Sequence, residues 1–117
     1  MAYQLTPEQR ELFSSELTAV SERVLHAITG RALLFYLFAD SHCGWQAEDV
    51  WPLTAALMRE LNAFVQADGV IGLGDYIQGN KPQRETREQF VEFRRHLTDI
   101  GIPYYLVIGN HEGNGYY

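Results

Sequence analysis

The residues most able to do chemistry stand in three short clusters, each at the end of an apolar run. Asp40 and His42 follow "ALLFYLFA", Asp75 follows "GVIGLG", and "GNHE" at 109–112 follows "PYYLVI". Asp75 lies 35 residues after Asp40, and Asn110 lies 35 residues after Asp75. Carboxylate, amide and imidazole groups are hard oxygen and borderline nitrogen donors. Together they predict a site for a divalent cation such as zinc, manganese or iron.

Each cluster alone has an ordinary structural explanation. Asp-x-His is common in surface turns, Gly-Asp commonly closes a strand, and "GNHE" could be a capped turn. The three clusters occur together, each after an apolar run and about one βαβ unit apart. This joint pattern favours a shared site over three unrelated turns.

The segments between the clusters alternate between strand-like and helical patterns. The runs 32–39, 69–74 and 103–109 are too short and too apolar for amphipathic helices, so they predict strands buried on both faces. A first helix is expected from a Thr6 capping box to about Gly30, with the stripe Phe13, Leu17, Val20, Val24 and Ile28 facing a core. Two more helices are expected, one after Pro52 and one ending at Gly101.

This order of elements predicts an α/β fold with a parallel sheet and right-handed crossovers. Parallel strands place their carboxyl ends at one edge of the sheet, and ligand sites in open α/β sheets gather there. We therefore expect Asp40, Asp75 and Asn110 to emerge at this edge, with His42 and His111 close by.

Composition narrows the classes of partner. The formal charge of −6 is the wrong sign for a sequence-independent grip on nucleic acid, which we expect only as a phosphodiester substrate. The opening "MAYQLTPEQR" lacks the layout of a signal peptide, and no apolar run approaches the roughly 20 residues that span a bilayer. We expect a cytoplasmic chain with no membrane partner. A phosphate-bearing ligand would need an added cation.

The clusters "DSH", "GD" and "GNHE", in this order and each after an apolar strand, resemble the first three motifs of the calcineurin-like metallophosphoesterase superfamily. The resemblance covers about residues 33–113. It implies a phosphate-ester hydrolase with two divalent metal ions (manganese, iron or zinc). By resemblance, Asp40 and His42 bind one ion, Asp75 bridges both, and Asn110 binds the second. His111 contacts the phosphate and helps protonate the leaving oxygen.

The resemblance also has structural implications. A bridging Asp75 requires its strand to lie between the other two, which predicts the strand order 1-2-3. Glu112 is expected to support its loop. Many relatives have an acidic residue where this chain has Gln78, so support for Asp75 is expected to be weaker or supplied differently.

The later histidine motifs of the family are absent from the sequence. We therefore interpret the chain as an N-terminal helix (1–31) followed by a partial metallophosphoesterase domain (32–117). This partial domain would be the N-terminal half of an αββα sandwich. The other face of the sheet would be covered either by the first helix or by a second sheet. The isolated chain is expected to hydrolyse phosphate esters poorly. It is also expected to expose apolar sheet surface and an unpaired strand edge, and therefore to self-associate.

Two other functional interpretations stay open. One is a noncatalytic phosphoesterase-like fragment that acts by association with a partner or with itself. The other is a flavodoxin-like or receiver-like domain, which fits the alternation of elements but leaves "GNHE" unexplained. Among the remaining residues, His96 is expected to be solvated and Cys43 to be a small loop residue. Trp45, Trp51, Tyr116 and Tyr117 are expected to pack rather than to stack on substrate.

Overall fold

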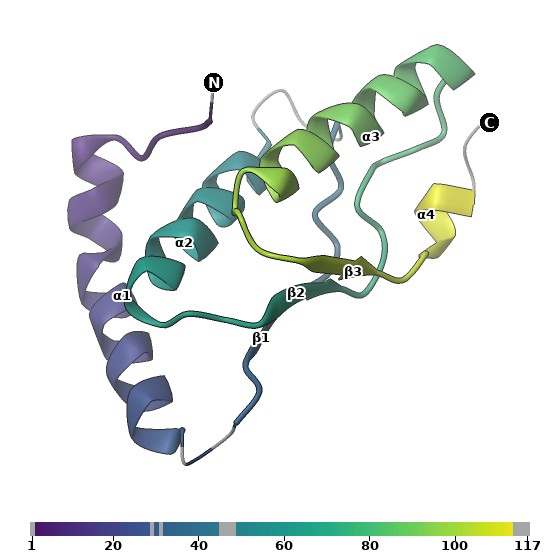
Figure 1. Ribbon diagram of the computed structural model, residues 1–117. Helices are drawn as coiled ribbons and strands as arrows, with labels where there is room; N and C mark the ends of the chain where they lie inside the picture. The colour runs from purple at the N-terminus through teal and green to yellow at the C-terminus, as the bar shows by residue number, and fades with distance from the viewer. Residues whose placement is uncertain (1, 29, 31, 45–48, 114–117) are drawn as a thin grey trace.

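The computed structural model describes residues 2–28, 30, 32–44 and 49–113, and its elements alternate as the sequence predicts (Figure 1). Trp45, Tyr116 and Tyr117 lie outside the described residues. The elements are, in order, α1 (Pro7–Ala27), β1 (Phe35–Phe38), α2 (Trp51–Phe64), β2 (Gly69–Gly72), α3 (Gln83–Thr98), β3 (Tyr104–Leu106) and α4 (Asn110–Gly113).

The three strands form one parallel sheet in the order β1-β2-β3, which confirms the predicted topology. Phe38 pairs with Gly72, and Gly72 pairs with Leu106. The strands are shorter than the apolar runs that predicted them. Their pairing nevertheless continues past the strand ends, because Cys43 forms a parallel bridge with Ile77. This continuation positions the loops that carry the predicted ligands.

Helix α1 begins at the predicted cap. The Thr6 hydroxyl accepts a hydrogen bond from the Gln9 main-chain N–H at 3.2 Å, and the Gln9 side chain accepts one from the Thr6 N–H at 2.9 Å. The helix packs against α2, where Arg10 pairs with Glu60 at 2.8 Å. No helix in the described part of the chain has both the length and the apolar character needed to cross a membrane.

The apolar stripe of α1 does not reach a core, which corrects the sequence prediction. Ser21 is the buried residue of α1, while the apolar members of the stripe are half-buried or exposed: Phe13, Leu17, Val20, Val24 and Ile28. In Figure 1, α1 lies beside α2 at the margin of the molecule rather than across the sheet. Contact with one helix covers only part of its apolar surface.

The core lies between the sheet and helices α2 and α3. Phe38 of β1 stacks on Trp51 of α2 with ring centroids 4.7 Å apart, and Tyr76 stacks on Phe93 of α3 at the same distance. The Trp51 indole N–H donates to the Phe93 main-chain oxygen at 3.0 Å, so its burial leaves no polar group unsatisfied. Trp51 therefore packs in the core, as expected.

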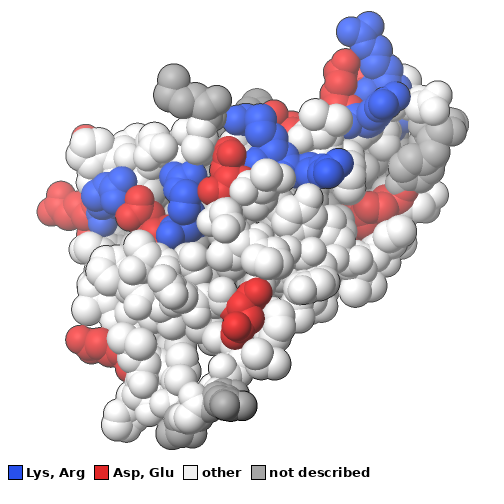
Figure 2. All heavy atoms as spheres, viewed as in Figure 1, with Lys and Arg blue, Asp and Glu red and all other residues white. Residues whose placement is uncertain are grey.

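The other face of the sheet is open. The strands are therefore buried on one face rather than on both, which agrees with the exposed apolar sheet surface expected of the isolated chain. Leu37, Leu73, Tyr105 and Val107 lie on this face and are each more than half exposed. Because α1 packs on α2, the first helix does not cover this face either. In Figure 2, Lys and Arg side chains gather over the helices, and the side of the sheet away from α2 and α3 carries few charges.

His96 is buried rather than solvated, which corrects a second prediction. Its Nε2 lies 3.0 Å from a carboxylate oxygen of Glu92, one turn earlier in α3. Its ring meets the ring of Tyr3 edge-on. The N-terminal segment is held across the helices by Arg59, which donates to the Tyr3 main-chain oxygen. Contacts between residues this far apart in the sequence leave no local sequence pattern from which the burial of His96 could be predicted.

Candidate metal centre

The predicted ligands emerge from the loops that follow β1, β2 and β3, which we call the first, second and third ligand loops. Asp40, His42 and Asp75 all have positive φ, at 54°, 40° and 56°. Residues other than glycine rarely adopt this left-handed backbone conformation, because their Cβ is crowded there. Three such residues in two adjacent loops indicate that the surrounding structure holds them in place, as is typical of functional sites.

Two histidines and one aspartate converge at this edge. One ring nitrogen from each of His42 and His111 and one carboxylate oxygen of Asp75 all lie within 4.8 Å of one another. The two imidazole rings meet edge-on with centroids 4.4 Å apart. Among the described residues, this is the one group of three such side chains placed for a metal ion.

These donors fit a divalent cation. Ligand atoms that are each about 2.1 Å from one ion lie roughly 3 to 4 Å from one another, so a small closing of this group would bring them into place. Two imidazoles and a carboxylate suit zinc, manganese or iron. The group contains two of the residues expected to bind metal, His42 and Asp75, together with His111, which the resemblance assigns to the phosphate.

The structure also locates the other two predicted ligands. A carboxylate oxygen of Asp40 lies 3.5 Å from His42 Nε2, and the Asp40 side chain is 70% exposed. Asp40 thus borders the group on its solvent side. Asn110 is the first residue of α4 and is exposed. The structure brings His42, Asp75 and His111 together, with Asp40 adjacent.

Glu112 fastens the second ligand loop to the third. Its carboxylate is buried and accepts hydrogen bonds from four main-chain N–H groups, those of Asp75, Tyr76, Ile77 and Gly109. Asp75 is oriented in turn, since its Oδ1 accepts from the His111 N–H at 2.9 Å. The expectation that Glu112 supports its loop is confirmed by these contacts.

Two glycines allow the same loops to approach each other. Gly74 has φ of 111°, and a Cβ on it would lie 2.8 Å from the Gly109 Cα. A Cβ on Gly109 would overlap the Asp75 carboxylate. The glycines of "GD" and "GNHE" therefore have a steric reason to be glycine, because any side chain would push the ligand loops apart.

Gln78 contacts both histidines. Its side-chain oxygen lies 3.0 Å from His42 Nδ1, and its main-chain oxygen lies 2.7 Å from His111 Nδ1. Sequence reasoning considered Gln78 only as a support for Asp75, which the His111 N–H supplies instead. Its role could have been found only by extending the parallel pairing past the strand ends, where Cys43 pairs with Ile77 and the Gln78 N–H donates to the Cys43 main-chain oxygen.

Cys43 follows His42 directly but is buried in the packed loop, as expected for a small loop residue. Its side chain faces the core beneath the bridge to Ile77. Burial, together with the carboxylates of Asp49 and Glu92, raises the pKa of the Cys43 thiol to about 12. Cys43 is not a member of the candidate group of metal ligands.

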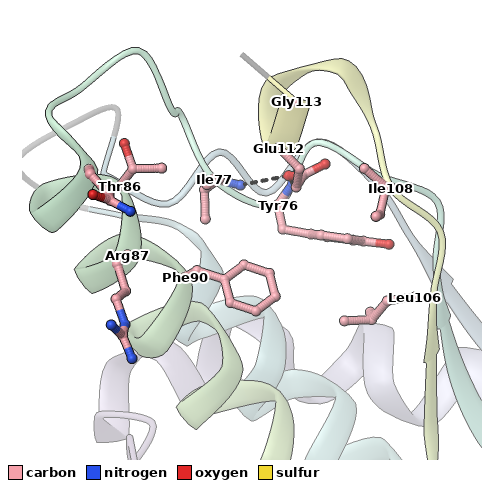
Figure 3. A pocket seen from close by; sticks show the side chains of 10 residues that line it. Tyr76, Ile77, Thr86, Arg87, Phe90, Leu106, Ile108, Glu112 and Gly113 are labelled. Atoms are coloured by element: carbon pink, nitrogen blue, oxygen red, sulfur yellow. Dashed lines mark hydrogen bonds between the residues drawn. The ribbon is translucent and has the colours of Figure 1, made fainter. Parts of the chain in front are cut away.

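A hollow of about 520 Å³ lies behind the ligand loops, between α3 and the end of β3 (Figure 3). Four side chains point into this space: Phe90 of α3, Leu106 at the end of β3, Ile108 just after β3, and Tyr76. The Tyr76 hydroxyl donates to the Val107 main-chain oxygen at 2.6 Å, and burial raises the pKa of this phenol. The hollow is apolar, and its lining does not include the candidate metal ligands His42, Asp75 and His111.

Comparison with protein families matches residues 33–117 to the calcineurin-like phosphoesterases. The matched segment begins before β1 and includes all three polar clusters. Comparisons with curated proteins and with solved structures gave no match.

Proposed function

Because this chain belongs to the calcineurin-like phosphoesterase family, we propose that it is a metal-dependent hydrolase of phosphate mono- or diesters. The observation that carries the proposal is the convergence of His42, Asp75 and His111 at the carboxyl ends of three parallel strands. The proposed metal ligands, for two divalent ions, are Asp40, His42, Asp75 and Asn110.

The charge of the site supports the same conclusion. Asp40 and Asp75 are two carboxylates at one edge of the sheet, in a chain with a formal net charge of −6. A phosphate ester would therefore be repelled from the site unless cations were bound. When bound, a divalent cation of this kind neutralises the carboxylates, polarises a phosphoryl oxygen and lowers the pKa of coordinated water.

The chain's own residues would then hold the reacting groups. The Asp75 carboxylate accepts from the His111 N–H, and the Asp75 main-chain N–H donates to Glu112, so Asp75 would be held in position as a metal ligand. His111 has Nδ1 bonded to the Gln78 main-chain oxygen, which leaves Nε2 to contact phosphate and to give a proton to the leaving oxygen when the ring is protonated.

Asp75→Asn is the most direct test of the site. Asparagine tolerates a positive φ, so this substitution removes a charged ligand while keeping the loop conformation. We expect the affinity for Mn²⁺ and Zn²⁺ to fall by at least about 100-fold. Loss of a residue that only hydrogen-bonds to a metal ligand already costs about 10- to 100-fold in affinity. Isothermal titration calorimetry would measure this affinity, and elemental analysis would measure the metal content.

Asp68→Asn is a matched control at the opposite end of the same strand. The Asp68 carboxylate accepts from the Leu34 N–H at 2.8 Å, and an asparagine oxygen can still accept this hydrogen bond. Its metal affinity should equal that of the wild type. Equal affinity in Asp75→Asn would remove Asp75 from the ligand set.

Hydrolysis of nitrophenyl phosphate and bis-nitrophenyl phosphate with added Mn²⁺ tests the reaction itself. The isolated chain is expected to hydrolyse these esters poorly, so even slow turnover supports the hydrolase if it depends on the metal and on Asp75. Metal binding without turnover of either ester would favour the alternative, a noncatalytic phosphoesterase-like fragment that acts by association.

A further inference from the structure

Two glutamine side chains hold the two histidines of the candidate metal centre, each by a different route. Gln78 acts on His42 directly, because its side-chain oxygen lies 3.0 Å from His42 Nδ1. The route to His111 passes through the peptide group between Gln78 and Gly79. Its C=O lies 2.7 Å from His111 Nδ1, and its N–H donates to the side-chain oxygen of Gln89 at 3.1 Å.

The planarity of the peptide group makes the second route effective. The C=O and N–H of one trans peptide lie in one plane and point in opposite directions. Because Gln89 fixes the N–H, it also fixes the direction of the C=O that meets His111. Gln89 is anchored on α3, and a Cβ on Gly44 would collide with its side chain, so Gln89 is packed closely against the first ligand loop.

The chemistry of these contacts determines where each imidazole carries its proton. A carbonyl oxygen only accepts hydrogen bonds, so Nδ1 of both His42 and His111 must donate. The Nε2 atom of each neutral ring then holds a lone pair. In His42 this atom lies 3.5 Å from an oxygen of the Asp40 carboxylate, on the side of the proposed metal. That carboxylate is a competing acceptor that favours a proton on Nε2, so the contact to Gln78 is needed to keep the proton on Nδ1. A histidine with its proton on Nε2 would present no lone pair there.

We propose that Gln78 and Gln89 are positioning residues that set the tautomer and ring orientation of His42 and His111, respectively. This inference rests on the proposed metal-dependent function of the site. It assigns the two glutamines separable tasks. A substitution at Gln78 changes the contact to His42 but leaves the main-chain contact to His111, whereas a substitution at Gln89 does the reverse.

The test uses ¹⁵N NMR of the imidazoles in the metal-free full chain, at a pH at which the spectrum itself shows both rings to be neutral. In the wild type, both His42 and His111 should show the tautomer protonated at Nδ1. In Gln78→Leu, His42 should shift toward the tautomer protonated at Nε2, which faces Asp40, while His111 stays unchanged. In Gln89→Leu, His111 should change while His42 stays as in the wild type.

Two further variants separate positioning from a general structural effect. Gln78→Glu keeps an oxygen that accepts from Nδ1, so His42 should retain the wild-type tautomer. Gln66→Leu replaces an exposed glutamine in the loop before β2 and should change neither ring. Zn²⁺ affinity measured by calorimetry should fall about 10- to 100-fold in Gln78→Leu and recover in Gln78→Glu.

The proposal is overturned if both histidines keep the wild-type tautomer in Gln78→Leu and Gln89→Leu. It is also overturned if Gln78→Glu loses the tautomer and the affinity as fully as Gln78→Leu does. Failure of the proposed function looks different. In that case the wild type binds no divalent metal, and the tautomer measurement in the metal-free chain still decides the role of the two glutamines.

Discussion

The two faces of the sheet carry similar apolar side chains but differ in burial. On the face toward α2 and α3, Phe38 is 9% exposed and Val70 is fully buried. On the other face, Leu37 is 62% exposed, although it precedes Phe38 in the same strand. Tyr105 is 58% exposed, although its strand pairs with the strand of Val70. The apolar character of a strand therefore shows that it can be buried, whereas its neighbours decide which face is buried.

The candidate site depends on the covered face. Tyr76 and Ile77 belong to the core, and their main-chain N–H groups hold the Glu112 carboxylate that joins two ligand loops. Substitutions on the covered face should therefore affect both folding and metal binding. Substitutions on the open face should affect association with other molecules and leave both properties intact.

The largest effect is expected for Phe93→Ala on the covered side. Phe93 is fully buried and its ring meets those of Phe38, Trp51 and Tyr76, so truncation should lower the free energy of unfolding by about 3–5 kcal/mol. Urea denaturation followed by circular dichroism would measure this loss. Phe64→Ala, at a side chain 65% exposed, is the matched control and should cost under about 0.5 kcal/mol. Similar losses in the two variants would contradict the comparison.

A smaller loss is expected from overfilling the covered face with Gly72→Ala. A Cβ at this position would lie 2.6 Å from the Tyr76 ring and 2.9 Å from Leu106, so both side chains must shift. Such overpacking costs about 1–3 kcal/mol of unfolding free energy. Gly113→Ala is the control, because a Cβ there meets nothing within 4 Å. A Gly72→Ala variant as stable as the control would show that this face packs loosely.

The smallest effect on stability is expected on the open face. The double variant Leu37→Thr, Val107→Thr replaces two exposed apolar side chains with polar ones that suit strands, so the free energy of unfolding should change by less than about 0.5 kcal/mol per site. Self-association should fall, since exposed apolar patches drive association. Analytical ultracentrifugation at several concentrations measures it.

Leu12→Gln on α1 provides the control for the association experiment. Leu12 is 69% exposed but lies on a helix rather than on the sheet, so its substitution should leave association unchanged. If the double variant associated as strongly as the wild type, the open face would not be the surface involved.

The sequence predicted the features that depend on local pattern and strand order. The capping box at Thr6, the three parallel strands and the gathering of His42, Asp75 and His111 follow from spacing and from the geometry of parallel sheets. These features need only short segments and a rule for joining them.

The sequence did not predict the features that depend on contacts between distant segments. His96 is buried because Tyr3 reaches it across the helices, and Gln89 acts through the peptide after Gln78. An exposed apolar sheet surface was expected for a partial domain, whereas the packing of α1 on α2 rather than on this surface has no local sequence signal. Side-chain pattern determines what a residue tolerates, and tertiary packing determines what it contacts.

The burial of Cys43 gives the molecule a built-in reporter of its own fluctuations. It is the single cysteine of the chain, and it lies at the bridge that pairs the first ligand loop with the second. A thiol reagent can reach it only in molecules in which this pairing has opened. The rate of labelling therefore records how often the first and second ligand loops separate. Because Cys43 is native to the chain and is its single cysteine, no labelling site has to be engineered.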